Sequence, residues 1–166
     1  MPLHYRAWLR FMREVGGDFP EDLFYSWGGR PPAEIVVDLN HRCGLALDVA
    51  DAVERKENYY LELLDEVQPI APVLDIVRAM HGKLPLAVTS GGPRRVVLRT
   101  LARIGVRDMF DVVVCADDYV RGKPAPDPFL ETARRLGVPP VRCLVFEDTV
   151  TGEQAARAAG MACVIV

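Results

Sequence analysis

Between residues 70 and 166, short apolar segments alternate with segments of helical periodicity, and this alternation restricts the fold more than any other feature of the sequence. The apolar segments, each expected to form a strand, cover residues 85–88, 110–116, 142–146 and 161–166. The helical patterns cover residues 73–80, 93–104, 127–136 and 151–159. Strands that are apolar throughout are typical of a parallel sheet with helices on both faces. The sequence therefore predicts a Rossmann-like α/β unit, whose ligands bind at the carboxyl ends of the strands.

Residues 1–67 have helical periodicity and no convincing strand. Trp8, Phe11, Met12 and Val15 have the i, i+3, i+4, i+7 spacing of one buried helix face. Further helices are expected at residues 20–27, 32–43 and 48–67, which makes a bundle of four helices. We expect two domains, a helical one over residues 1–67 and the α/β core over residues 68–166.

Composition excludes several classes of protein. Half of the residues are hydrophobic, the formal net charge is -3, and acidic and basic residues are interspersed, so no basic surface for nucleic acid is expected. No apolar run approaches the roughly 18 residues of a membrane span, and the N-terminus lacks the apolar centre of a signal peptide. The four cysteines show no zinc-like spacing. We expect a soluble, cytoplasmic protein.

The first candidate site follows the strand expected at residues 85–88, where Ser90 precedes Gly91, Gly92 and Pro93. Glycines allow backbone N–H groups to approach an anion, and a helix N-terminus favours negative charge. The segment is therefore a candidate phosphate-binding loop. A simple helix start, with Gly92 as N-cap and Pro93 at the first helical position, is the alternative.

The second candidate is Lys123, which lies in the segment Gly-Lys-Pro-Ala-Pro-Asp before a predicted helix. Prolines stiffen this turn, so less entropy is lost when the lysine becomes ordered, which suits a point charge directed at phosphate. A solvated loop with Asp127 as the helix N-cap is the alternative.

The third candidate is the pair Glu147 and Asp148, which ends an apolar strand. Both could serve to cap the next helix, but Thr151 and Gln154 already form a capping box in sequence and leave the acids without that role. Carboxylates at the edge of a parallel sheet, beside a phosphate site, suit Mg²⁺.

The sequence resembles the haloacid dehalogenase superfamily in three motifs that occur in the family's order. These are a hydroxyl residue after a strand, a lysine in GKPAPD and an ED pair after a later strand. The resemblance covers essentially the whole chain, and the helical half resembles the small four-helix cap of β-phosphoglucomutase and related sugar-phosphate phosphatases. It implies a Mg²⁺-dependent phosphatase that acts on a small-molecule phosphate ester. It also implies that Ser90 and Gly91 bind the phosphoryl group, Lys123 neutralises its charge, Asp148 binds Mg²⁺ and Glu147 orients a metal-bound water.

The family pattern also includes a strand that ends in Asp-x-Asp-Gly, whose first aspartate is the nucleophile and whose second is the acid and base. The sequence contains no such segment, and residues 1–8 resemble those that follow it in the family. We therefore expect a core that lacks its central first strand, between the strands ending at Val88 and Phe146. The chain as given is expected to be incomplete and inactive.

The resemblance also implies that basic cap residues contact the rest of the substrate. Lys56 lies among apolar residues on one face of the predicted fourth helix. Its side chain either points into the site or extends its ammonium into water. Arg30 and His4 correspond to cap residues near the site, although a lone histidine is more often structural. Such groups suit an acidic or polyhydroxylated phosphate ester. A phosphatase, a phosphomutase and a non-catalytic domain that binds phosphate and Mg²⁺ remain open, as do a monomer and a homodimer.

Overall fold

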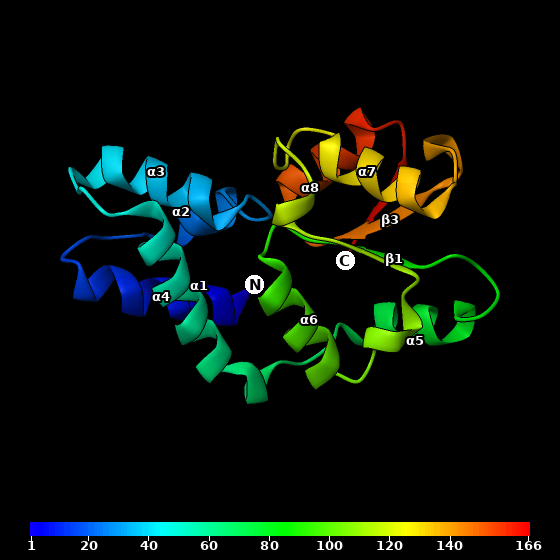
Figure 1. The fold of residues 1–166 in the computed structure, drawn as a ribbon, viewed down its shortest axis with the longest axis horizontal. Helices are drawn as coiled ribbons and strands as arrows, with labels where there is room; N and C mark the ends of the chain where they lie inside the picture. The colour runs from blue at the N-terminus through cyan, green and yellow to red at the C-terminus, as the bar shows by residue number, and fades with distance from the viewer.

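The computed structural model describes residues 1–166 and divides into a helical half and an α/β half (Figure 1). The helical half contains α1 (Pro2–Glu14), α2 (Glu21–Ser26), α3 (Pro32–Cys43) and α4 (Val49–Glu62), followed by a 3₁₀ turn at Leu64–Glu66. This order confirms the predicted run of four helices. The position of a domain boundary at residue 67 stays a prediction. No helix is both long enough and apolar enough to cross a membrane.

An aromatic core holds the helical half together. Trp8, Phe11 and Met12 of α1 are buried, as the helical spacing predicted, and they pack with Phe19 and Phe24. The rings of Trp8 and Phe19 meet edge to face with their centroids 5.7 Å apart, a favourable geometry for aromatic pairs. Residues at the helix ends set where the helices begin and end. The helix α3 ends at Gly44, which has the left-handed conformation, and the side chain of Asp48 caps the N-terminus of α4.

The second half alternates helices and strands, as predicted. Its helices are α5 (Ala71–Met80), α6 (Arg94–Arg103), α7 (Asp127–Leu136) and α8 (Val150–Ala158). Its strands are β1 (Ala87–Thr89), β2 (Val112–Val114), β3 (Leu144–Glu147) and β4 (Ala162–Ile165). All four strands are shorter than the apolar segments that predicted them. The helix α7 has the predicted bounds.

All strand pairs are parallel, but they form two separate two-stranded sheets. Val88 of β1 pairs with Val113 of β2, and Val145 of β3 pairs with Cys163 of β4. No pairing joins β1 to β3. In Figure 1, α7 and α8 cover one face of the strands, whereas α5 and α6 lie on the other side. The facing edges of β1 and β3 are thus left without partners.

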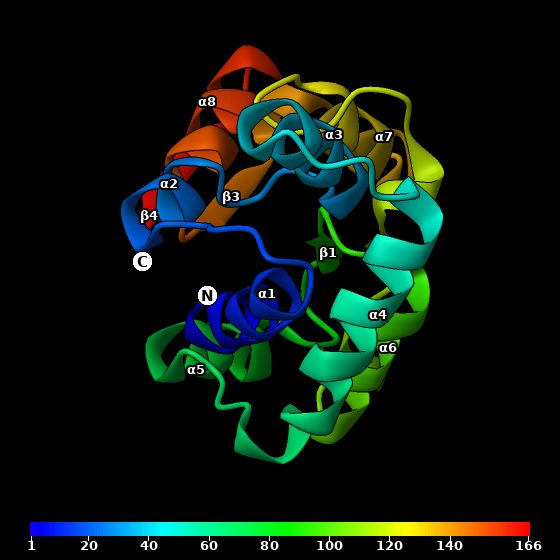
Figure 2. The same ribbon diagram turned by 90° about the vertical axis from the view of Figure 1, so that its left-hand side faces the viewer.

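The helical half packs against the α/β half through α6. Ala7 of α1, Tyr60 of α4 and Val96 of α6 form one buried cluster, and Figure 2 shows α4 beside α6. Because α6 directly follows the loop after β1, this contact places α1 and α4 beside the carboxyl end of β1.

Candidate active site

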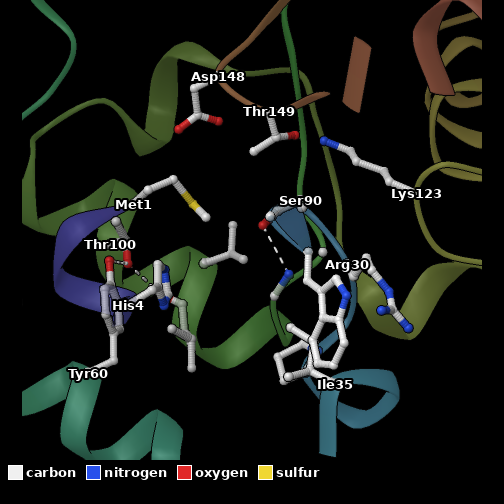
Figure 3. Close-up of a pocket in the computed structure, with 18 of the residues that line it drawn as sticks. Met1, His4, Arg30, Ile35, Tyr60, Ser90, Thr100, Lys123, Asp148 and Thr149 are labelled. Carbon is white, nitrogen blue, oxygen red and sulfur yellow. Dashed lines mark hydrogen bonds between the residues drawn. The ribbon is translucent and has the colours of Figure 1, made fainter. Parts of the chain in front are cut away.

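A cavity of about 360 Å³ lies between the helical half and the ends of β1 and β3. Its lining includes residues from the first turn of α1, from α4, from the loop before α3 and from the segments after β1 and β3. Figure 3 shows Ser90, Lys123, Asp148 and Thr149 around this space, with His4 and Tyr60 farther along it. The three sites predicted from the sequence therefore meet in one cavity, at the carboxyl ends of the strands.

Ser90 is held at the end of β1 by its backbone. Its N–H donates to the carbonyl of Val114 at 2.9 Å, and its Oγ accepts from the N–H of Gly92 at 3.1 Å. The helix α6 starts at Arg94 with Pro93 as its N-cap, so the alternative in which Gly92 is the N-cap is wrong. Gly92 instead helps to orient the Ser90 hydroxyl.

Gly91 brings the same loop against the helical half. A Cβ at Gly91 would overlap the carbonyl oxygen of Gly29, closer than such atoms can approach. A Cβ at Gly122 would likewise overlap Cδ of Pro31. The Thr151 hydroxyl adds a hydrogen bond to the carbonyl of Gly28. The loop before α3 therefore packs directly against the segments that contain Gly91, Gly122 and Thr151.

Lys123 is buried rather than solvated, which rejects the free-loop alternative. Its side chain is 4% exposed, and its ammonium donates a hydrogen bond to Oε1 of Glu147. The ammonium also lies 4.9 Å from the centre of the Phe129 ring, within the range of a cation–π contact. Asp127 does not cap α7, because Pro126 is the N-cap and Asp127 pairs with Arg121.

Glu147 uses both carboxylate oxygens within the chain. Oε2 accepts hydrogen bonds from the N–H of Asp148 and of Thr149, both at 3.1 Å, and from the Thr149 hydroxyl at 2.8 Å. Gly152 leaves the space that this carboxylate fills, since a Cβ there would overlap Cδ of Glu147. Glu147 therefore fixes the position of Lys123 directly.

The start of α8 differs from the expected capping box. Thr149, not Thr151, is the N-cap, and its Oγ accepts from the N–H of Gly152 at 3.0 Å. Thr149 precedes the helix directly, whereas Thr151 lies within its first turn and is already bonded to Gly28. The carboxylate of Asp148, in contrast, has no hydrogen bond or ion pair to a protein side chain and is exposed at the cavity.

Lys56 lies in the cavity wall, and its ammonium does not extend into water. The side chain is 2% exposed and donates to Oε1 of Glu57 at 2.9 Å. Its Nζ also lies 3.0 Å from Nδ1 of His4. The alternative of an ammonium in water is wrong because α1 and the aromatic rings of Trp8 and Tyr60 cover this position.

His4 is held in a fixed orientation beside Lys56. Its ring stacks on Tyr60 with centroids 3.9 Å apart, and the Tyr60 hydroxyl lies 3.1 Å from Oγ1 of Thr100. Burial, together with the charge of Lys56, holds the pKa of His4 well below its usual value. The neutral ring accepts the hydrogen bond from the lysine.

Arg30 borders the cavity but is engaged by carboxylates of α3. Its guanidinium lies 2.7 Å from Oδ2 of Asp38 and 3.6 Å from Oε2 of Glu34. Sequence reasoning missed Glu57, which also lines the cavity. An acidic residue next to a lysine is common on exposed helix faces, so nothing in the sequence indicated that Glu57 is buried.

Comparison with known proteins assigns the chain to a family. The model of the haloacid dehalogenase-like hydrolases matches residues 9–160. The chain belongs to this family. A fructose-1-phosphate phosphatase of Escherichia coli, YqaB, is 40% identical over 164 residues, which cover 96% of this chain and 85% of the relative.

Solved structures of related proteins agree with the fold of this haloacid dehalogenase-like hydrolase. β-Phosphoglucomutase from Clostridium difficile has a TM-score of 0.83 at 26% identity, over 97% of this chain and 75% of that one. A point mutant of CbbY from Rhodobacter sphaeroides, in complex with xylulose-(1,5)bisphosphate, has a TM-score of 0.85 at 25% identity, over 99% and 78%. The predicted family and α/β fold class are confirmed.

The donor set of this haloacid dehalogenase-like hydrolase suits a magnesium ion that has few protein ligands. No group of three or more histidine, cysteine or acidic side chains could enclose a metal. The free carboxylate of Asp148 is a hard oxygen ligand, and Mg²⁺ is commonly bound by one or two carboxylates, with water and substrate phosphate completing its shell. Asp148 is therefore the residue that would hold it, with Glu147 adjacent but already bonded to Lys123.

Proposed function

We propose that this protein is a magnesium-dependent phosphatase that acts on a sugar phosphate. The observation that carries the proposal is the convergence of Ser90, Lys123 and Asp148 on one cavity at the carboxyl ends of β1 and β3. A hydroxyl, an ammonium and a free carboxylate are the groups needed to bind a phosphoryl group together with a divalent cation. The 40% identity to a fructose-1-phosphate phosphatase supports a sugar phosphate as the substrate class.

The charges around the cavity support the role of the metal. Among the ionised side chains that line it, Lys123 is paired with Glu147, Lys56 with Glu57, and Arg30 with acids of α3. Asp148 alone has no partner, so a phosphate dianion bound beside it would be repelled unless a cation lies between them. Mg²⁺ would supply this compensation and stabilise the charge that develops on the phosphoryl oxygens.

The chain's own residues position the phosphoryl group. The Ser90 hydroxyl and the backbone N–H groups near Gly91 would donate hydrogen bonds to its oxygens. Lys123, fixed by Glu147 in a buried position, would direct its remaining N–H donors at the same oxygens. Because these groups are already ordered, little reorganisation is needed when charge builds up in the transition state.

The nucleophile, in this proposal, is an aspartate on a further strand between β1 and β3. The support is the division of the sheet, whose facing edges are unpaired, and the apolar side chains of Val88 and Phe146 that line the cavity between them. The aspartate attacks phosphorus and the sugar oxygen leaves with a proton from a neighbouring acid, and water then hydrolyses the aspartyl-phosphate. Without that strand, residues 1–166 would not turn over substrate.

The test compares phosphate release from fructose 1-phosphate by the full-length protein, as its gene encodes it, and by residues 1–166. Activity is expected from the full-length protein with Mg²⁺ and none after chelation with EDTA. Asp148→Asn should lower kcat by at least about 100-fold, the scale of losing one preorganised electrostatic group. Asp75→Asn, an exposed acid on α5, is the matched control and should have full activity. Turnover that survives EDTA or Asp148→Asn would contradict the proposal.

A further inference from the structure

Glu57 carries the one buried side-chain oxygen that has no hydrogen-bond partner in the structure. The side chain is 2% exposed and Oε1 is bonded to Lys56, but Oε2 accepts nothing. A buried polar atom without a hydrogen-bond partner is destabilising. Because Glu57 lines the cavity, a ligand that enters it can supply the missing donor.

The basic groups that line the cavity have no uncompensated positive charge, both at the Glu57 end, where Lys56 and His4 lie, and on the opposite side, where Arg30 lies near Ser90. Lys56 is neutralised by Glu57 at 2.9 Å, and His4 is the neutral acceptor of the Lys56 ammonium. Arg30 is bonded to Asp38 and lies near Glu34, which together carry more charge than it does. A second phosphate or a carboxylate on the substrate would therefore meet no free cation here.

We propose that Glu57 selects phosphate esters whose distal part is uncharged and hydroxylated, by accepting a hydrogen bond from a substrate hydroxyl on Oε2. The inference rests on the proposed function and narrows its substrate class. A hydroxyl donates a hydrogen bond to the orphaned oxygen, whereas a distal phosphate dianion or carboxylate has no proton to donate and leaves it unpaired. Sites built around a buried hydrogen-bonding group discriminate strongly against ligands that cannot satisfy it.

The orphaned oxygen of Glu57 also favours phosphatase over mutase chemistry. Transfer of the phosphoryl group to a second hydroxyl of a sugar phosphate produces a sugar bisphosphate, so a mutase must accommodate a distal phosphate. CbbY has been crystallised with such a bisphosphate, and its fold is the same. In this chain Glu57 of the helical half lines the cavity and disfavours a distal phosphate. Water, rather than a second sugar hydroxyl, is then the acceptor of the phosphoryl group.

The experiment uses the full-length protein with Mg²⁺ and three substrates: p-nitrophenyl phosphate, fructose 1-phosphate and fructose 1,6-bisphosphate. The kcat/KM for the monophosphate should exceed that for the bisphosphate by at least about thirtyfold, the discrimination that one unpaired buried group provides. Glu57→Gln is isosteric and removes the negative charge that neutralises Lys56. It should reduce the ratio of the two kcat/KM values by about tenfold. Glu54→Gln, an exposed acid on the same helix, should leave the ratio unchanged.

Comparable turnover of both sugar phosphates by the unmodified protein would overturn the inference, and so would an unchanged ratio in a Glu57→Gln variant that circular dichroism shows to be folded. The aryl phosphate has no distal hydroxyls and reports the phosphoryl site alone. Hydrolysis of the aryl phosphate without sugar discrimination would refute the role of Glu57 only. Absence of all three activities would refute the proposed phosphatase and this inference with it.

Discussion

Lys123 and Glu147 form a buried ion pair that links two segments 24 residues apart, and each of them has further contacts that fix it. Glu147 accepts three hydrogen bonds from the Asp148–Thr149 segment, and Lys123 lies over Phe129. Removal of one partner from a buried ion pair leaves an uncompensated charge, which is usually more costly than removal of both. The pair therefore contributes to stability as well as to the site.

Lys123→Met is expected to lower the free energy of unfolding by about 3 kcal/mol. The double variant Lys123→Met/Glu147→Gln should regain part of this loss, because no unpaired charge remains. Urea unfolding followed by circular dichroism measures both, and Lys83→Met, an exposed lysine before β1, is the control. Equal losses in the single and double variants would show that the ion pair is not the cause.

His4 gives the stability of the protein a pH dependence of known sign. Burial and Lys56 lower the pKa of His4 in the folded state, so the unfolded chain binds a proton more readily than the folded one. Stability is then full above the unfolded pKa of about 6.5 and is lost as the pH falls below it. The slope from this residue approaches about 1.4 kcal/mol per pH unit.

Unfolding free energies measured between about pH 7 and pH 5, on either side of the ordinary histidine pKa, should therefore fall less steeply in His4→Gln than in the unmodified protein. The acidic residues titrate in both proteins, so the difference of the two slopes isolates His4. His41→Gln, an exposed histidine in the last turn of α3, should show the same slope as the unmodified protein. Parallel slopes for all three proteins would contradict this assignment.

At the scale of elements, the contact between the helical half and the loops after β1 and β3 depends on glycine backbones. Gly91 lies against Gly29, and Gly122 against Pro31, without room for a methyl group. The bond from Thr151 to Gly28 crosses the same contact. Closure of the helical half over the cavity thus requires the absence of side chains at these positions.

Gly91→Ala is expected to separate the two halves, because its Cβ would overlap the carbonyl oxygen of Gly29. The phosphatase activity proposed above should fall by at least about tenfold, the scale of losing substrate alignment. Solution X-ray scattering should show a larger radius of gyration. Gly92→Ala, whose Cβ would meet only the side chains of Val97 and Ser90, is the matched control with a smaller effect. An unchanged radius in Gly91→Ala would contradict the explanation.

The sequence predicted elements well and contacts between distant side chains poorly. Periodicity located all eight helices and four strands, with α7 matched to the residue, because burial on one face repeats at a fixed spacing. The positions of Ser90, Lys123 and Asp148 after predicted parallel strands indicated that they meet at one edge, and they do line one cavity, whereas their roles stay predictions. It could not show that Lys56 and Arg30 are neutralised by Glu57 and Asp38, since such pairing depends on how α1, α3 and α4 pack.

At the scale of the whole molecule, the division of the sheet into two pairs of strands has a consequence for stability. Unpaired strand edges expose backbone donors and acceptors, and β1 and β3 each present such an edge toward the cavity. The full-length protein, if the proposed strand fills the gap, should unfold at a temperature several degrees above that of residues 1–166, since about 1 kcal/mol shifts the midpoint by roughly 2–4 °C at this size. Differential scanning calorimetry of the two chains tests this, and equal midpoints would argue against an inserted strand.

The unpaired edges of β1 and β3 could also accept an extended peptide, because main-chain hydrogen bonds alone can add a strand to an open sheet. A synthetic peptide with an apolar run followed by Asp-x-Asp-Gly could complement residues 1–166 when it is supplied as a separate molecule. Catalysis would then depend on peptide concentration, and the protein would work as a two-component reporter with phosphate release as its signal.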